Sequence, residues 1–225
     1  MDAKELIARR VAQELRDHTL VNLGIGLPTL VAKYVPPGVE VAFQSENGII
    51  GFGSPPPTGM EDPNLTDAGG GFISALPGAV SFDSAFSFML IRARPSRHDR
   101  VGRPRGGYKR ASRQLDGSGQ ARARHGGSMD LVAGARRVIV AMQHTARGRS
   151  KIVPKLTLPP TSVRPVSLVV TDLAVLHPTP DGLMLQERAP GVSVAEIIAA
   201  TAAPLLIADD IPEMGIVVAG PMMVR

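Results

Sequence analysis

The residues best suited to chemistry lie in one short stretch, Gln44-Ser45-Glu46-Asn47-Gly48-Ile49-Ile50-Gly51. A β-branched run at residues 39–43 precedes it and predicts a strand that delivers Glu46 at its carboxyl end. Open α/β sheets bind ligands at that end of their strands, where an exposed carboxylate can be a reactive side chain. Asn-Gly is also a strong turn signal, and a glutamate before it is commonly just solvated. Spacing alone favours the turn interpretation for Glu46.

A glycine turn, Gly24-Ile25-Gly26, forms a second candidate site. It lies between an expected strand at residues 19–23 and an expected helix that begins near Pro28, because proline suits the first turn of a helix. Such a unit can point backbone N–H groups at an anion. A plain tight turn is an equally good interpretation. The third glycine of a dinucleotide fingerprint and the Lys-Ser/Thr of a P-loop are missing, so neither is expected.

The elements around these candidates alternate between helix and strand. Residues 2–16 predict an amphipathic helix, with apolar side chains every four residues from Ala3 to Leu15. The other expected elements are strands at 72–76, 137–142, 166–170, 173–176 and 205–207, a loop at 51–71, a turn at Pro77-Gly78, a buried helix at 81–91, a helix-like segment at 126–132, a hairpin at Asp181-Gly182 and a helix after the capping box of Ser193 and Glu196. This order predicts a single α/β domain over residues 1–225, with an open, largely parallel sheet and flanking helices.

The composition excludes several classes of site. Without cysteine, the 225-residue chain has no disulfide framework, no cysteine nucleophile and no thiolate metal site. The histidines His98, His125, His144 and His177 do not converge by spacing, so no metal site is expected and these side chains are interpreted as structural or solvent-facing. The N-terminus does not resemble a signal peptide, and no apolar run approaches the roughly 20 residues that span a bilayer. The expectation is a cytoplasmic protein with no membrane partner.

The net charge of +5 comes from one basic segment. Residues 92–124 hold 11 of the 25 lysines and arginines but only 2 of the 20 acids, so this segment carries +9 and the rest of the chain −4. An arginine-rich segment can bind phosphate, so a nucleic-acid-binding protein is the alternative functional class. Only Tyr108 is available for stacking in it, and no recognition module surrounds it, so no nucleic-acid partner is expected. A solvated, disordered insertion is a third interpretation.

Several blocks of the chain resemble, in family order, the beta subunit of 3-oxoacid CoA-transferases, which use succinyl-CoA with acetoacetate or 3-oxoadipate. The blocks are residues 21–29, 45–51, 64–69, 76–79, 82–84, 126–132 and 171–175. The resemblance covers residues 1–92 and 126 to about 214. The Ser-Glu-Asn-Gly element is weak by itself but specific in this order with the other blocks.

The resemblance implies that Glu46 is the nucleophile. Carboxylates are ionised at neutral pH, so attack on an acyl-CoA needs no general base. The implied sequence passes through a mixed anhydride to a glutamyl-CoA thioester, so CoA is a substrate carried transiently and no cofactor is expected. Backbone N–H groups at Asn47-Gly48 or at Gly126-Gly127 are oxyanion candidates, and Gly24 and Gly26 are candidates for CoA binding. The resemblance further implies a CoA-transferase alpha subunit in a heterodimer or larger heteromer, with the active site where the two chains meet.

Residues 93–125 depart from the family pattern, which has Gly-Gly-His-Leu/Ile-Asp, Asn-Trp-Met-Val-Pro-Gly-Lys and Gly-Met-Gly-Gly there. The genetic code suggests a reason. Gln114–Gln120 can be encoded by CAA CTG GAT GGT TCC GGC CAA, and reading one base later gives AAC TGG ATG GTT CCG, or Asn-Trp-Met-Val-Pro. Arg94–Arg97 likewise permits Gly-His-Leu-Asp. We therefore interpret this segment as an out-of-frame reading, with the frame lost near Ala93 and restored near Gly126. The tail at residues 215–225 also departs from the family and is given no role.

The sequence therefore predicts the beta subunit of a CoA-transferase that moves CoA from succinyl-CoA to a 3-oxo acid. The favoured acceptor is 3-oxoadipate, from the β-ketoadipate pathway of aromatic-compound degradation, and this preference rests only on the loop at residues 55–62. Acetoacetate is the alternative acceptor.

Overall fold

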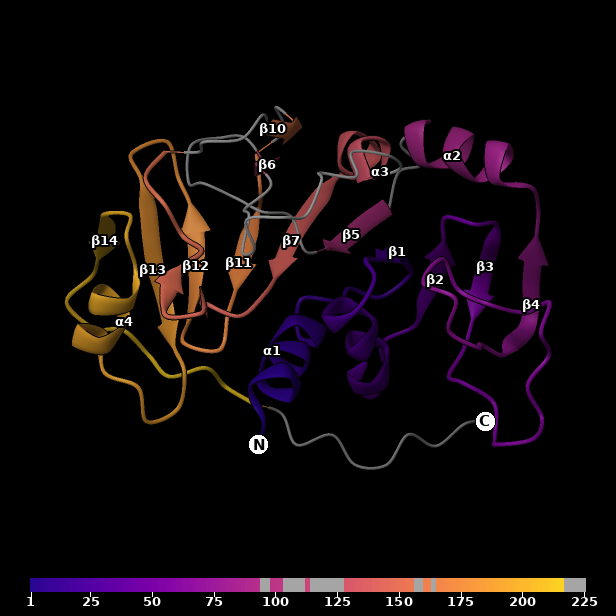
Figure 1. Ribbon diagram of the computed structural model, residues 1–225, viewed down its shortest axis with the longest axis horizontal. Helices are drawn as coiled ribbons and strands as arrows, with labels where there is room; N and C mark the ends of the chain where they lie inside the picture. Colours follow the sequence, from indigo (N-terminus) through magenta and orange to yellow (C-terminus); the bar gives the residue numbers. More distant parts are fainter. Residues whose placement is uncertain (94–97, 103–111, 114–127, 156–159, 163–164, 217–225) are drawn as a thin grey trace.

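The computed structural model describes residues 1–93, 98–102, 112–113, 128–155, 160–162 and 165–216 of the chain. In this part of the chain, one ten-stranded sheet has the order β14-β13-β12-β11-β7-β5-β1-β2-β3-β4 (Figure 1). The central strands run parallel to one another. They are β11 (Leu168–Val170), β7 (Arg137–Ala141), β5 (His98–Gly102), β1 (Thr19–Leu23) and β2 (Val41–Ser45).

Antiparallel hairpins form both margins of the sheet. At one margin, β3 (Ile49–Phe52) pairs antiparallel with β2 and with the edge strand β4 (Ala75–Ser81). At the other, β12 (Ala174–Pro178) pairs antiparallel with β11 and with β13 (Leu183–Arg188), and β14 (Leu205–Ile207) runs parallel to β13. The predicted α/β class and flanking helices are confirmed, and the predicted parallel pairing describes the centre of the sheet.

Helix α1 (Ala3–Ala12) and the 3-10 helix η1 (Leu27–Tyr34) lie side by side and pack on the sheet through the main core cluster. Ile7 and Val11 are fully buried there, which confirms the predicted apolar stripe. The helix ends at Ala12, earlier than predicted, although Leu15 is still buried beyond it. The helix predicted from Pro28 is present in the tighter 3-10 form.

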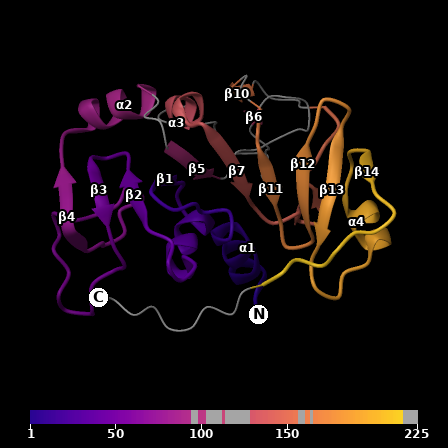
Figure 2. The ribbon, with the colours of Figure 1, turned by 180° about the vertical axis from the view of Figure 1, so that it is seen from behind.

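Helices α2 (Ser84–Arg92) and α3 (Ser128–Gly134) lie side by side, away from α1 (Figures 1 and 2). Their approach is so close that a Cβ on Gly134 would lie 2.0 Å from the Ile91 carbonyl oxygen. The helix predicted at residues 81–91 is present as α2, but the prediction that it is buried is wrong. Only Ser87 and Ile91, which share one face, are buried, whereas Phe86 is 42% and Met89 54% exposed.

Two predictions at the β4 margin are also wrong. Residues 51–71 were expected to form only a loop, yet β3 extends into this range as far as Phe52. Pro77-Gly78 was expected to be a turn, yet it lies inside β4. Strand β4 is an edge strand, and proline is tolerated at an edge because its missing N–H can fall on the unpaired side.

In the C-terminal half, the predicted turn and the predicted helix cap are both present. Asp181-Gly182 connects β12 to β13, and α4 (Val194–Ala200) begins with the predicted capping box of Ser193 and Glu196. Four short strands form two separate small sheets: β6 (Ser112–Arg113) with β10 (Pro160–Ser162), and β8 (Thr145–Ala146) with β9 (Arg149–Ser150). Among the residues described, no helix is both long and apolar enough to cross a membrane.

Candidate active site

Glu46 lies at the tip of the β2–β3 hairpin, whose last paired residues are Ser45 and Ile49. Glu46 is therefore a turn residue that also stands at the carboxyl end of a central-sheet strand, so its position agrees with either interpretation of the sequence. Its side chain is partly buried. Within the described ranges, its carboxylate makes no hydrogen bond or ion pair. The hairpin thus presents a carboxylate that is not committed to a structural contact.

Gly48 fixes the hairpin against the start of α2. Its carbonyl oxygen accepts a hydrogen bond from the Phe82 N–H at 2.9 Å, and its own N–H donates to the Ser45 carbonyl at 3.0 Å. Gly48 has φ +130°, and a Cβ on it would lie 1.9 Å from the Phe82 carbonyl oxygen, so only glycine fits. The Gly48 N–H closes the turn and helps to position Glu46, so in this structure it is already engaged and does not point at a substrate.

The loop at residues 66–72 holds the hairpin from the other side. The Ala68 N–H donates to Ser45 Oγ at 2.8 Å, and Asn47 Nδ2 donates to the Thr66 carbonyl at 2.7 Å. The Asn47 side chain is therefore engaged with the neighbouring loop. Its backbone N–H remains the oxyanion candidate at this hairpin.

Gly24 and Gly26 lie at the same edge of the sheet as Glu46, since they follow β1 and β1 is parallel to β2. Gly26 has φ +88° and precedes η1, where its carbonyl oxygen accepts hydrogen bonds from Thr29. Ile25, which lies between them, contacts the loop at residues 66–72, because a Cβ on Gly69 would lie 3.3 Å from Ile25 Cγ2. The structure thus brings the glycine turn and the Glu46 hairpin together around the loop at 66–72. The predicted oxyanion residues Gly126 and Gly127 lie outside the described residues.

The sequence interpretation missed three buried polar residues that are hydrogen-bonded to one another beneath the hairpin. Asn22 Nδ2 donates to the Gln44 carbonyl at 3.1 Å, and Gln44 Nε2 donates to Ser87 Oγ at 3.1 Å. All three residues are almost fully buried, so these bonds anchor β2 two residues before Glu46. The sequence did contain a signal for them, because Asn22 and Gln44 are polar residues within otherwise largely apolar strands.

A family model described as coenzyme A transferase matches residues 4–94. The beta subunit of the acetate CoA-transferase of Haemophilus influenzae is 44% identical over 217 residues, which cover 96% of this chain and 97% of that protein. This chain belongs to the CoA-transferase family.

Other CoA-transferases show the same relation. The matching subunit of the 3-oxoadipate CoA-transferase of Acinetobacter baylyi is 37% identical, over 90% of this chain and 94% of that protein. The matching subunit of the succinyl-CoA:3-ketoacid coenzyme A transferase of Helicobacter pylori is 39% identical, over 86% and 94%. The crystal structure of an acyl-CoA transferase from Escherichia coli O157:H7, in a thioester complex with CoA, superposes with a TM-score of 0.70 at 18% identity. It shares the fold over 97% of this chain, which spans only 45% of that longer chain.

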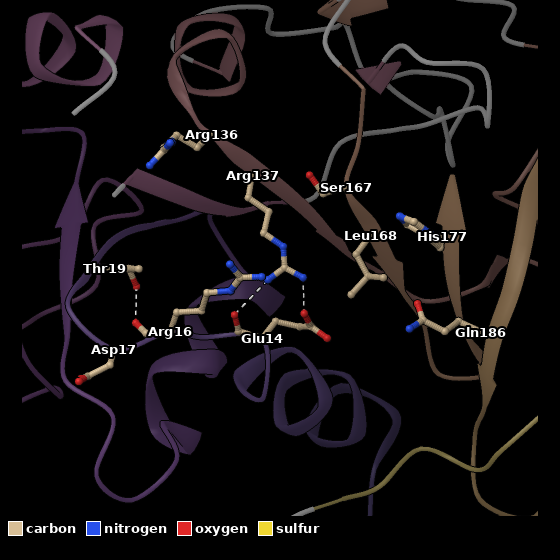
Figure 3. Close-up of a pocket in the computed structure, with 10 residues that line it drawn as sticks. All are labelled: Glu14, Arg16, Asp17, Thr19, Arg136, Arg137, Ser167, Leu168, His177 and Gln186. Carbon is tan, nitrogen blue, oxygen red and sulfur yellow. Dashed lines mark hydrogen bonds and ion pairs between the residues drawn. The ribbon is translucent and has the colours of Figure 1, made fainter. Parts of the chain in front are cut away.

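A cavity of this CoA-transferase chain, whose lining residues are drawn in Figure 3, lies at the end of the parallel strands opposite to Glu46. It has a volume of about 740 Å³ and is lined by Glu14, Arg16, Asp17, Thr19, Arg136, Arg137, Ser167, Leu168, His177 and Gln186. Thr19, Arg137 and Leu168 are the first residues of their parallel strands, which places the cavity at the amino ends. It is therefore not part of the candidate active site.

An ion-pair network beside this cavity joins α1 to the sheet. Arg10 donates to both carboxylate oxygens of Glu187 at 2.7 Å and to Glu14 at 2.8 Å, and Arg137 also pairs with Glu14 (Figure 3 shows the last pair). Burial alone would raise the pKa of Glu14, but the hydrogen bonds from Arg137 and Arg10 outweigh it and lower the pKa. These charges are mutually satisfied and serve the structure.

His144 is a structural histidine, as expected. It is fully buried, and its Nδ1 and Nε2 lie 2.9 Å from the hydroxyl oxygens of Thr171 and Thr201 respectively. Burial lowers its pKa from 6.5 to about 4, although Asp172 partly opposes the shift. In the described ranges, no group of three or more metal-ligating side chains is present.

Acidification is expected to destabilise the chain through His144. The unfolded chain protonates this side chain below about pH 6.5, whereas the folded chain does so only near pH 4. Its contribution is therefore fully present above pH 6.5 and is lost as the pH falls to 4, a loss of roughly 3 kcal/mol. Urea unfolding between pH 7 and 4 measures it. His144→Gln should flatten the pH dependence and the exposed control His177→Gln should not; parallel curves for all three proteins would contradict the assignment.

Proposed function

We propose that this chain is the beta subunit of a CoA-transferase in which Glu46 is the nucleophile. The observation that carries the proposal is the Glu46 hairpin, which stands at the carboxyl edge of the parallel sheet. The residues on both sides of Glu46 are fixed by hydrogen bonds, while the carboxylate itself is unengaged within the described ranges. A positioned carboxylate of this kind suits covalent catalysis.

The proposed reaction has two symmetric halves. The Glu46 carboxylate attacks the thioester carbonyl of an acyl-CoA, so that a C–O bond forms, the C–S bond breaks and CoA thiolate leaves a mixed anhydride. The thiolate then attacks the glutamyl carbonyl of the anhydride and releases the first carboxylic acid as its carboxylate, which leaves CoA on Glu46 as a thioester. The carboxylate of the second acid reverses these steps and takes the CoA. Among the described residues, the Asn47 backbone N–H, next to Glu46 in the chain, is the proposed hydrogen-bond donor to the oxyanion of each tetrahedral intermediate.

For the substrates, we propose succinyl-CoA as donor and a 3-oxo acid as acceptor, with 3-oxoadipate of aromatic-compound degradation first and acetoacetate second. The relatives named 3-oxoadipate CoA-transferase and succinyl-CoA:3-ketoacid coenzyme A transferase, at 37% and 39% identity, support this choice. The relative named acetate CoA-transferase, at 44% identity, favours acetate as a further acceptor to be compared.

The test is to trap the covalent intermediate. The two-subunit enzyme is incubated with succinyl-CoA alone and then treated with borohydride, which reduces a glutamyl thioester, or with hydroxylamine, which cleaves it. We expect one succinate released for each Glu46 and a mass change at the peptide that carries it. Initial rates with 3-oxoadipate, acetoacetate and acetate then rank the acceptors. Turnover with no covalent species on Glu46 would overturn the proposal.

The CoA-transferase alpha subunit is the proposed partner, and the surface around β4 and α2 is its proposed contact. Strand β4 is exposed at all but one position. Two large apolar side chains are exposed on this surface, Val80 on β4 (52%) and Met89 on α2 (54%). The relatives are each named as a subunit, and the E. coli acyl-CoA transferase carries additional chain beyond the part that matches here. An apolar edge beside the nucleophile is suited to a second chain that completes the site.

Charged substitutions on this surface are expected to prevent assembly. Val80→Asp and Met89→Asp should each weaken, by at least about 30-fold, the association with the alpha subunit, because they bury a charge in an apolar contact. Ile198→Asp is the matched control. Ile198 is 49% exposed, but it lies on α4, which connects β13 and β14 at the opposite margin of the sheet. Titration calorimetry with the purified partner measures the affinities. Loss of binding in the Ile198 variant alone would move the interface to the other margin.

We also propose that residues 93–125 are an out-of-frame reading, and the position of β5 supports this. Strand β5 lies between β1 and β7, where Val21, Asn22, Ile139 and Val140 are at most 1% exposed. Buried parallel strands are nearly continuous apolar runs, yet β5 is His-Asp-Arg-Val-Gly. Its codons can be CAT GAC CGT GTT GGG followed by C, and reading one base later gives ATG ACC GTG TTG GGC, or Met-Thr-Val-Leu-Gly. The same one-base offset restores the family pattern at Arg94–Arg97 and at Gln114–Gln120.

A further inference from the structure

Asp67 organises a small closed loop at residues 66–72. Its Oδ1 accepts hydrogen bonds from the backbone N–H groups of Gly69 and Gly71, both at 2.8 Å. Its backbone N–H donates to the Gly71 carbonyl at 2.8 Å, and its carbonyl accepts from the Gly70 N–H at 3.0 Å. A bridge between Thr66 and Phe72 closes the ends of the loop. The Asp67 carboxylate therefore holds the loop in its closed conformation through these hydrogen bonds.

This loop holds the residues on both sides of Glu46. The Ala68 N–H reaches Ser45 Oγ at 2.8 Å, and the Thr66 carbonyl receives Asn47 Nδ2 at 2.7 Å. Ser45 is only 3% exposed, so its bond to Ala68 is shielded from water. Ala68 and Thr66 flank Asp67 in the chain, and their positions follow from the conformation that the Asp67 carboxylate imposes.

The loop is not itself suited to bind an anion, despite its three glycines. The N–H groups of Gly69, Gly70 and Gly71 are all used inside the loop. The N–H of Ala68 is used by Ser45. A glycine-rich loop with its donors consumed in this way supports neighbouring residues and does not hold a ligand through its backbone.

We propose that Asp67 is a positioning residue for the reaction, which acts on Glu46 through Ser45 and Asn47. The inference rests on the proposed role of Glu46 as the nucleophile. Loss of the Asp67 carboxylate leaves two loop N–H groups without their acceptor and releases Ala68 and Thr66. The Glu46 carboxylate then loses its fixed approach to the thioester carbonyl. A displacement of about 1 Å at a reacting group costs on the order of 100-fold in rate.

The experiment compares variants in the assembled two-subunit enzyme. Asp67→Ala is expected to lower kcat and the rate of thioester formation from succinyl-CoA by about 10- to 100-fold, with KM changed by less than about threefold. Asp67→Asn keeps an acceptor oxygen and should recover most of the rate. Asp62→Ala is the matched control, because Asp62 also accepts a backbone N–H, from Asn64 at 2.8 Å, but its contacts do not reach the Glu46 hairpin. It should retain wild-type rates.

Ser45→Ala tests the same path without altering the loop, and it decides the matter if Asp67→Ala fails to fold. We expect Ser45→Ala to lower kcat, and the double variant to lose less than the product of the two single losses, because both act through one contact. Wild-type kcat in both Asp67→Ala and Ser45→Ala, alongside an inactive Glu46→Gln enzyme, would overturn the role of Asp67. Full activity of the Glu46→Gln enzyme would overturn the proposed function instead.

Discussion

Replacement of Glu46 by glutamine in the two-subunit enzyme is expected to abolish CoA transfer, with a loss of at least about 10⁴-fold. Glutamine has nearly the same shape but no nucleophilic carboxylate, so the covalent path is closed. The fold should be retained, because within the described ranges the carboxylate makes no structural contact. The measurement is the rate of acyl-CoA formation, together with the mass of the chain after incubation with succinyl-CoA and its thermal unfolding midpoint.

Two further variants make this result specific to Glu46. Glu40→Gln removes an exposed carboxylate just before the same strand and should leave the rate unchanged. Glu46→Asp keeps a carboxylate but withdraws it by one methylene, so it should retain a small fraction of the activity, on the order of 1%. Wild-type turnover of Glu46→Gln, or equal losses in Glu46→Gln and Glu40→Gln, would exclude Glu46 as the nucleophile.

Replacement of β5 by an apolar strand is expected to raise the free energy of unfolding by at least about 5 kcal/mol. The variant carries the one-base-later reading of this strand: His98→Met, Asp99→Thr, Arg100→Val and Val101→Leu. Parallel strands at the centre of a sheet are nearly continuous apolar runs, and each buried apolar side chain contributes about 1.5–3 kcal/mol. The gain is comparable with the whole stability of an ordinary domain, so urea unfolding and soluble yield should both respond.

The control for this prediction exchanges the charges without removing them, as Asp99→Arg with Arg100→Asp, and should give no gain. DNA sequencing across codons 92–127 tests the cause directly. We expect a frame change near codon 93 and a compensating one near codon 126. A single open frame that encodes the arginines, in a chain that β5 replacement does not stabilise, would show that the basic segment is native.

The sequence was most informative where one local rule acted alone. The strand at Thr19–Leu23, the capping box of Ser193 and Glu196 and the hairpin at Asp181-Gly182 are all present as predicted. Each depends on side chains within a few residues of one another, so local chemistry decides it. Glu46 needed more, because its own spacing could not separate a turn from a reactive site and only the order of the flanking blocks identified the family.

Other failures concern burial and side-chain contacts, which depend on distant parts of the chain. The aromatic run near Phe86 has the composition of a core, yet only Ser87 and Ile91 of α2 are buried, and Phe86 itself is exposed. The anchoring role of Asn22 could not be seen either, because it depends on pairing with Gln44 in a neighbouring strand. Asp67 shows the same limit, since its carboxylate looks like an ordinary turn residue until Ser45 and Asn47 are placed beside its loop.

The lack of room at Gly48 couples the Glu46 hairpin to the segment at Phe82 that leads into α2. With the Phe82 carbonyl pressed against Gly48, and the Phe82 N–H bonded to it, neither segment can shift without the other. A partner chain that docks on the exposed side of α2 would therefore also set the angle at which Glu46 meets its substrate. Assembly and the orientation of Glu46 would then be mechanically linked, because a load on α2 is passed to the hairpin through the Phe82–Gly48 contact.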